Sequence, residues 1–196
     1  MNTARRSVVA ALCAGAAATA ILLSSMSTTS GAAPAERRNA APSEVAPADA
    51  APTDTLAAVR RATAKYHDPA VALADGFIAT EECAAHPELG GMGLHYVNPA
   101  RIGDPSIVAT EPEVLLYEPS PDGGVRLVGV EWLAIDDDGD LTTDHDRPSV
   151  LGTAFDGPMP GHDEHMPVHY DLHAWVWKHN PAGTFAVWNP TVRCEP

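Results

Sequence analysis

The sequence predicts a single α+β domain in which a pair of N-terminal helices packs on a mostly antiparallel sheet or small barrel. Apolar residues recur at helical spacing up to residue 75 and alternate at strand spacing beyond it. All the phenylalanine, tyrosine and tryptophan residues of the 196-residue chain lie between Tyr66 and Trp188. A stretch of that length supports one hydrophobic core and not two, so residues 53–196 are expected to form one globular domain.

The first predicted elements are two helices, over residues 54–66 and 69–75. Their boundaries are indicated by residues with terminal preferences: Thr53, Asp68, Pro69 and Gly76. Threonine and aspartate cap helix N-termini, proline suits the first helical position, and glycine suits the position after the last turn. A short extended piece is expected next, at residues 77–78.

The rest of the domain is predicted to be mostly extended. Strands are expected over residues 94–97, 112–118, 125–135, 167–178 and 184–188. The turn at residues 119–124 is rich in proline and glycine, which predicts a hairpin between the second and third of these strands. The glycines at 90–93 are expected to lead into the first strand. Residues 136–166, rich in Pro, Gly, Asp and His, are expected to form a long loop.

The N-terminal segment is predicted to direct export. Residues 1–35 combine a positively charged start, an apolar run and a small, polar end, which is the pattern of a signal peptide. Residues 36–52 are rich in Ala and Pro, lack aromatics, and are predicted to be a disordered tether. We therefore expect a secreted or periplasmic location after cleavage. An uncleaved anchor, and twin-arginine export through Arg5 and Arg6, are the alternatives.

Two of the three cysteines are expected in the mature domain. Cys13 leaves with the signal peptide, and Cys83 and Cys194 remain. In an oxidising compartment these two thiols are expected to form a disulfide. The alternatives are two free thiols or a cysteine-containing metal site.

The charge excludes some partners. With 12 basic and 26 acidic residues the net charge is −14. Nucleic acids and anionic membranes need a basic patch, so no nucleic acid and no membrane insertion of the mature chain is expected. An acidic surface permits cations or an unknown small ligand.

Common catalytic motifs are missing from the sequence. None of the serines beyond residue 53 lies in a Gly-x-Ser-x-Gly elbow, and there is no P-loop or dinucleotide fingerprint. The acidic run at 136–140 resembles a calcium loop, but with Gly139 at position 6 of an EF-hand, positions 1 and 12 hold Ala134 and His145. We interpret it as a solvated charge run, with a weak calcium contact as the alternative. Whether the chain is an enzyme stays open.

The histidines are the strongest chemical signal. Nine are present, and the loop at 162–165 has ligand types that suit Cu²⁺, Ni²⁺ or Zn²⁺. His169 and His173 have the spacing of a zinc helix, where they would lie about 6 Å apart. The alternation around them favours a strand, on which they lie about 13 Å apart and cannot share an ion.

A cross-strand cluster remains as the predicted site. Glu131 lies in the middle of an apolar strand, where an unpaired carboxylate is costly, so it needs a partner. His95 and His173 lie at similar positions in other strands, and two histidines and a carboxylate from adjacent strands match a site for zinc or copper. Glu113 and His169 are further candidate ligands. The alternatives are a hydrogen-bonded network that includes Arg126 or a backbone donor, or a Glu131 that faces water.

Four segments carry a resemblance to known sequences: KYHDPAVALADGF, GGMGLHYVNP, PEVLLYEP with LVGVEW, and HAWVWKHNPAGTFAVWNPTVRC. From Lys65 to Cys194 the chain resembles a family of secreted bacterial proteins of unknown function. The resemblance implies one exported domain with a Cys83–Cys194 bond, and it implies no catalytic residue.

Two functions are therefore expected from the sequence. The first is an exported domain that binds a divalent transition metal through His95, Glu131 and His173. The alternative is a non-enzymatic binding module whose acidic and aromatic surface recognises a ligand by stacking on Trp175, Trp177 or Trp188. The first requires the three side chains to converge on one point, and the second requires exposed tryptophans.

Overall fold

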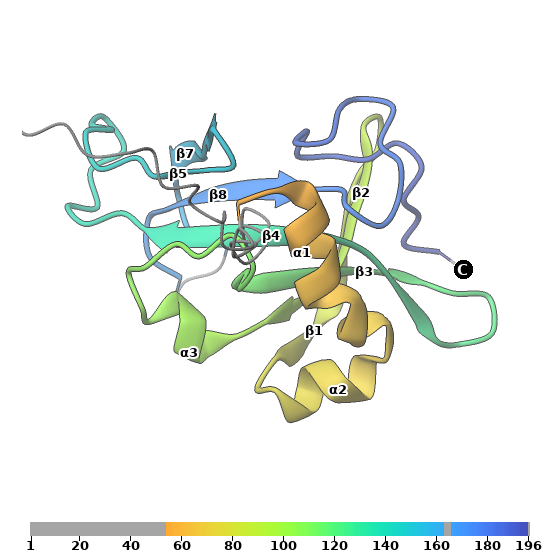
Figure 1. The fold of residues 1–196 in the computed structure, drawn as a ribbon. Helices are drawn as coiled ribbons and strands as arrows, with labels where there is room; N and C mark the ends of the chain where they lie inside the picture. The colour runs from red at the N-terminus through yellow and green to blue at the C-terminus, as the bar shows by residue number, and fades with distance from the viewer. Residues whose placement is uncertain (1–53, 163–165, 196) are drawn as a thin grey trace, which may run out of the picture. The chain divides into compact units, whose positions relative to one another are not determined.

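The structure is a computed structural model that describes residues 54–162 and 166–195. The predicted signal peptide and tether, 1–35 and 36–52, lie outside the described residues. The fold agrees with the predicted class, because short N-terminal helices precede a six-stranded antiparallel sheet with the curvature of half a barrel (Figure 1). The helices of the described segments all fall short of the length and apolar character that crossing a membrane requires.

The elements follow one another in a simple order. The helical elements are α1 (Leu56–Thr63), the 3-10 turn η1 (Ala64–His67), α2 (Pro69–Ala74) and α3 (Pro99–Ile102). The strands are β1 (Ile78–His86), β2 (Gly90–Val97), β3 (Val114–Pro119), β4 (Val125–Ile135), β5 (Ser149–Val150), β6 (Thr153–Ala154), β7 (Asp156–Met159) and β8 (His169–Ala174). The main sheet has the order β1-β2-β3-β4-β8-β7, and β5 and β6 form a separate small pair.

The helix boundaries are partly as predicted. Asp68 caps α2 by accepting a hydrogen bond from the Ala70 backbone, and Pro69 begins the helix. The predicted cap at Thr53, which lies outside the described residues, is wrong, because the side chain of Thr55 accepts from the Ala58 backbone and caps α1. Helix α1 also ends earlier than predicted, at Thr63. The chain then continues as the tighter 3-10 turn η1, ahead of Pro69.

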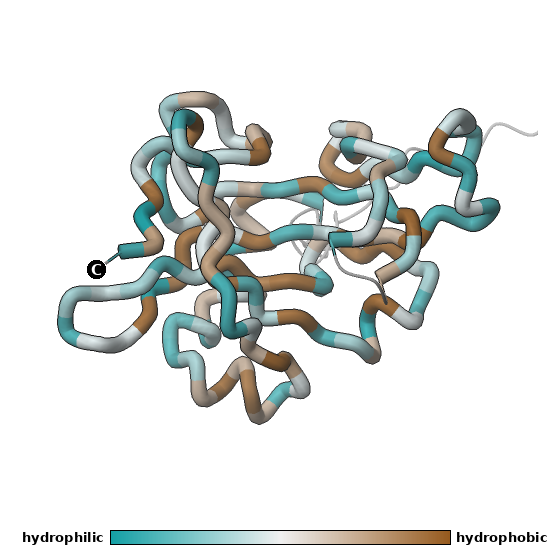
Figure 2. The backbone as a smooth tube through the Cα atoms, turned by 180° about the vertical axis from the view of Figure 1, so that it is seen from behind, coloured by the Kyte–Doolittle hydropathy of each residue, from teal (hydrophilic) through white to brown (hydrophobic). Residues whose placement is uncertain are grey.

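The β3–β4 hairpin is confirmed, and its strands are buried on both sides. One face of the sheet packs against the helices, in a core that includes Val59, Tyr66 and Val130. A smaller cluster, which includes Leu116 and Val192, lies on the opposite face. Figure 2 shows that the strands alternate between hydrophobic and hydrophilic stretches. The hydrophilic positions on the face away from the helices form the candidate site.

The glycines at 90–93 belong to β2, so the prediction that they only lead into the strand is wrong. Gly91 pairs with Asn189 through two backbone hydrogen bonds of 3.1 and 3.0 Å. A Cβ on Gly90 would lie 2.2 Å from the Asn189 carbonyl oxygen, so glycine is what lets the C-terminal segment approach β2. This single bridge replaces the strand predicted at 184–188, which is not formed.

The segment predicted as a long loop, 136–166, contains three short strands. β7 pairs with β8 at the edge of the main sheet, and β5 and β6 form a two-stranded hairpin. These strands span two to four residues, and β7 contains Gly and Pro, so the sequence shows no alternation long enough to predict them. Conversely, the predicted strand 167–178 ends at Ala174 in β8.

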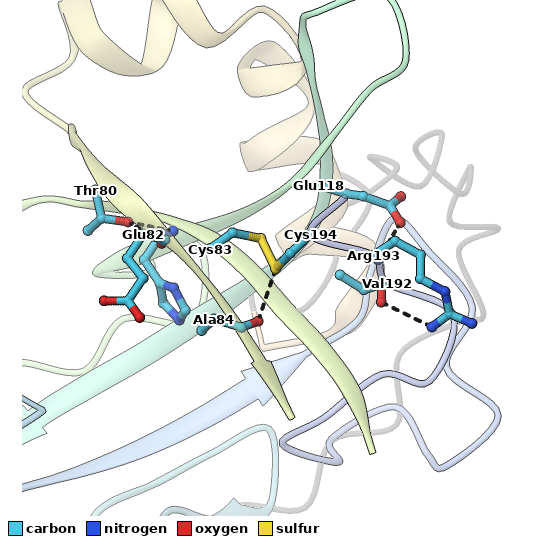
Figure 3. The surroundings of a disulfide bond; sticks show 9 residues. Thr80, Glu82, Cys83, Ala84, Glu118, Val192, Arg193 and Cys194 are labelled. Carbon is cyan, nitrogen blue, oxygen red and sulfur yellow. Dashed lines mark hydrogen bonds between the residues drawn. A yellow bond between two sulfur atoms is a disulfide. The ribbon is translucent and has the colours of Figure 1, made fainter. Parts of the chain in front are cut away.

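The predicted disulfide is present in the structure. Cys83 of β1 bonds to Cys194 in the C-terminal segment, with 5.6 Å between their Cα atoms (Figure 3). The same segment is held by Glu118, whose carboxylate accepts from the Arg193 backbone at 2.9 Å. Cys83 also pairs in register with Leu94, the neighbour of His95, so the disulfide secures the strand that carries a predicted ligand.

Candidate metal centre

Three interior strands bring His95, Glu131 and His173 together. Glu131 of β4 lies directly opposite His173 of β8 in the strand register. On the other side of β4, Glu131 lies opposite Val114 of β3, and β3 pairs in turn with β2, which carries His95. Because alternate residues of a strand share a face, all three side chains emerge on the face away from the helices.

The ligand atoms of these residues converge. His95 Nε2 lies 3.5 Å and His173 Nε2 lies 3.8 Å from the same oxygen, Glu131 Oε2. One ligand atom from each residue lies within 4.8 Å of the other two. Among the described residues, this is the one group of three histidine, cysteine or carboxylate side chains with that convergence.

The cluster is buried and its polar atoms lack partners. The side chain of His173 is fully buried, that of Glu131 is 4 % exposed, and that of His95 is 19 % exposed. Glu131 Oε2 and His173 Nε2 make no hydrogen bond within the described part of the chain. Arg126, a partner considered from the sequence, lies on the β3–β4 ladder opposite Glu118 and not at Glu131. Buried polar atoms without partners cost free energy, so this site calls for a ligand between them.

Burial also decides the protonation of the cluster. It lowers the pKa of His95 to about 4 and that of His173 to about 3, with further lowering from the nearby His162. It raises the pKa of Glu131 well above its ordinary value, and the charges of Asp171 and Glu113 act in the same direction. The 3.5 and 3.8 Å contacts have the distances of ion pairs, but neutral histidines cannot form them. Two neutral imidazoles facing a carboxyl group are instead a ready set of metal ligands.

The outer side of the His173 imidazole also faces a polar group. His173 Nδ1 lies 3.8 Å from Asp171 Oδ1, two residues earlier on the same strand. Carboxylates and backbone carbonyls are the usual outer partners of histidines that bind metals.

The two further candidate ligands lie outside the converging group. Glu113 is buried, with a pKa raised by burial to about 7, but its Oε2 accepts from the Leu133 backbone at 3.1 Å. His169 is on β8, as predicted, and it does not belong to the converging group. Its Nδ1 lies 3.2 Å from the Pro167 carbonyl, and its ring packs on His162 at 5.0 Å between centroids.

The two polar loops do not form comparable sites in the described residues. Residues 163–165 of the predicted histidine loop lie outside them. In the acidic run, Asp136, Asp138 and Asp140 accept hydrogen bonds from backbone N–H groups a few residues ahead. Their carboxylates stabilise the turn itself, in agreement with the interpretation of a charged, largely solvated loop.

The tryptophans do not offer a stacking surface. Trp175 is buried and donates to the Ala186 carbonyl at 2.6 Å. Trp177 is half-buried and donates to Thr63, and Trp188 is half-buried beside His86. The indoles instead fix the C-terminal segment and the helices to the sheet. The alternative function, a binding module that stacks a ligand on exposed tryptophans, is therefore not supported by their positions.

Two surface pockets, of about 410 and 350 Å³, lie elsewhere. They are lined by residues of α3, the segment after it and the acidic loop, and by no residue of the cluster. The larger pocket includes Glu113 and Arg101 at its wall. The candidate site is therefore the cluster of His95, Glu131 and His173, and not either pocket.

Comparison with known proteins adds no relative to the geometry of the cluster. No protein-family model, no curated protein and no solved structure matches this chain. The resemblance to secreted bacterial proteins stays a prediction from the sequence.

Proposed function

We propose that the protein is an exported domain that binds one divalent transition-metal ion through His95 Nε2, Glu131 Oε2 and His173 Nε2. The observation that carries this proposal is the convergence of three ligand atoms from three strands, two of them buried without a hydrogen-bond partner among the described residues. Zinc and copper are the metals proposed, because imidazole and carboxylate suit both.

The distances support a metal of this size. Around a tetrahedral zinc ion with bonds of about 2.1 Å, neighbouring ligand atoms lie about 3.4 Å apart. The two distances to Glu131 Oε2, 3.5 and 3.8 Å, are close to this value, and all three ligand atoms lie within 4.8 Å of one another. Side-chain rotations that draw the ligand atoms together would therefore complete the site without moving the strands.

The number of ligands supports an open coordination sphere. Structural zinc sites use four protein ligands, whereas catalytic sites use three and leave a position for water or substrate. Three residues converge here, and His95 is the one that reaches solvent. A bound ion would supply Lewis acidity at this position, and the protein would orient it through three rigid strands.

The compartment forms part of the proposal. The Cys83–Cys194 disulfide suits an oxidising environment, and the export signal predicted in residues 1–35 would deliver the chain there. Outside the cell a protein competes with other ligands for metal ions. A preformed site binds more tightly because its side chains need little ordering when the ion enters.

The test begins with the protein purified from its own export compartment without a histidine tag. We expect elemental analysis to find about one zinc or copper ion per chain. After chelation, zinc titration against a chromophoric chelator should show one tight site. The variants His95→Ala and Glu131→Gln should lose stoichiometric binding while keeping the disulfide.

A matched control separates this site from weak binding by exposed imidazoles. His179 is exposed, and only its backbone carbonyl is used, by Asn189 and Thr191. The variant His179→Ala removes a histidine without touching the cluster, so it should bind zinc as the wild type does. Equal binding by all three variants, or none by the wild type, would refute the proposed function.

A further inference from the structure

We infer that Asp171 positions His173 for the metal by accepting a hydrogen bond from its Nδ1–H, so that Nε2 presents its lone pair to the ion. The inference rests on the proposed metal site and deepens it, because it assigns a role to a residue that is not a ligand.

The contacts on the two sides of the His173 ring carry the inference. Nε2 lies 3.8 Å from Glu131 Oε2, and Nδ1 lies 3.8 Å from Asp171 Oδ1. All four atoms are buried, and none has a hydrogen-bond partner within the described residues. The ring is therefore placed between two carboxyl groups, one on the side of the converging ligands and one behind it.

The tautomer of His173 follows from this arrangement. A neutral imidazole carries a single proton, which occupies one of its two nitrogens. A proton on Nε2 would remove the lone pair that the metal needs. A carboxylate behind Nδ1 holds the proton on that side and makes Nε2 a stronger ligand.

The sheet keeps Asp171 in place. It lies two residues before His173 on the interior strand β8, so both side chains are on the same face. Leu133 of β4 and Asp156 of β7 flank it in register, and Asp171 is 3 % exposed. No large movement is needed to shorten the 3.8 Å contact to a hydrogen bond.

Nuclear magnetic resonance of the metal-free, ¹⁵N-labelled protein tests the tautomer directly, because the ring proton is then placed by the protein and not by an ion on Nε2. Long-range ¹H–¹⁵N correlations of the ring should identify His173 as the Nδ1–H form. The variant Asp171→Asn, which keeps the shape of the side chain, should bind zinc about 10–100-fold more weakly at the same single site. In that variant the Nδ1–H resonance should shift or exchange faster.

The matched control is Asp137→Asn. It removes an exposed carboxylate of the acidic run after β4, outside the converging group, and its zinc affinity should stay within about twofold of the wild type. An Nε2–H form of His173 in the metal-free protein, or an Asp171→Asn affinity equal to that of the control, overturns the inference and leaves the metal site standing. A wild type that binds no zinc overturns the proposed function instead. If Asp171→Asn does not fold, the tautomer in the wild type decides.

Discussion

Glu131 is one of three buried carboxyl groups, with Glu113 and Asp171, whose raised pKa values make the stability of the metal-free protein depend on pH. Its pKa is raised by burial, so the folded state keeps the proton and the unfolded state loses it above about pH 4.5. The stabilisation is present below that pH and is lost as the pH rises through the folded pKa. His95 and His173 act in the opposite direction, because their pKa values are lowered to about 4 and 3 and stability is lost as the pH falls below 6.5.

The variant Glu131→Gln isolates the carboxyl group. At pH 8 the metal-free variant should melt several degrees above the metal-free wild type, because glutamine does not ionise. At pH 5 the wild-type carboxyl is protonated and resembles the amide, so the two melting temperatures should agree. Calorimetry of both proteins after chelation measures the difference. The same small difference at both pH values would mean that Glu131 is ionised throughout.

Reasoning from single residues predicted the three converging side chains and missed Asp171 beside them. An unpaired carboxylate in the middle of an apolar strand is costly, so Glu131 was expected to have a partner, and His95 and His173 were the candidates. Asp171 has the same property, since it lies between Tyr170 and Leu172 on a strand with apolar neighbours. The rule applied to Glu131 would have identified Asp171 as well, but its contact with His173 depends on the side-chain geometry within β8.

At the scale of elements, the disulfide closes most of the domain. Cys83 and Cys194 are 111 residues apart, and closing a loop of that length lowers the entropy of the unfolded chain by about 5 kcal/mol in free energy. The double variant Cys83→Ser and Cys194→Ser should therefore unfold at clearly lower urea concentration. A loss below about 1 kcal/mol would show that the C-terminal segment is held by its hydrogen bonds alone.

Strand β2 requires a glycine at position 93. Its φ is +97°, and a Cβ there would lie 2.3 Å from the Tyr117 carbonyl oxygen of β3. Gly93→Ala should cost at least about 2 kcal/mol and weaken metal binding through His95. Gly123 has a similar φ of +83° but open space around it, so Gly123→Ala should cost about 1 kcal/mol and leave binding unchanged. Equal losses in urea unfolding would contradict the steric argument.

The elements differ in how well their sequences specify them. The β3–β4 hairpin was predictable because alternating apolar residues flank a turn of Pro, Asp and Gly. β7 was not, since its four residues pair only because β8 lies beside them. The glycines of β2 look like a loop in isolation, and their role becomes visible only when the C-terminal segment crosses them.

At the scale of the whole molecule, the composition predicts that residues before 53 add nothing to the core. Residues 36–52 hold no aromatic side chain, so little apolar surface is available to bury. A protein that begins at residue 53 should melt within about 1 °C of the full mature chain and bind zinc with the same affinity. A melting temperature lower by many degrees would show that the segment docks on the domain.

The central claim is that one metal ion lies between His95, Glu131 and His173. Crystals of the untagged, exported protein, with anomalous diffraction at the absorption edge of its metal, test it most directly. We expect one anomalous peak at about 2.0–2.1 Å from both Nε2 atoms and about 2.0–2.2 Å from a carboxylate oxygen of Glu131. Exported protein that has no peak there, or a peak only at the histidines of residues 162–165, would contradict the claim.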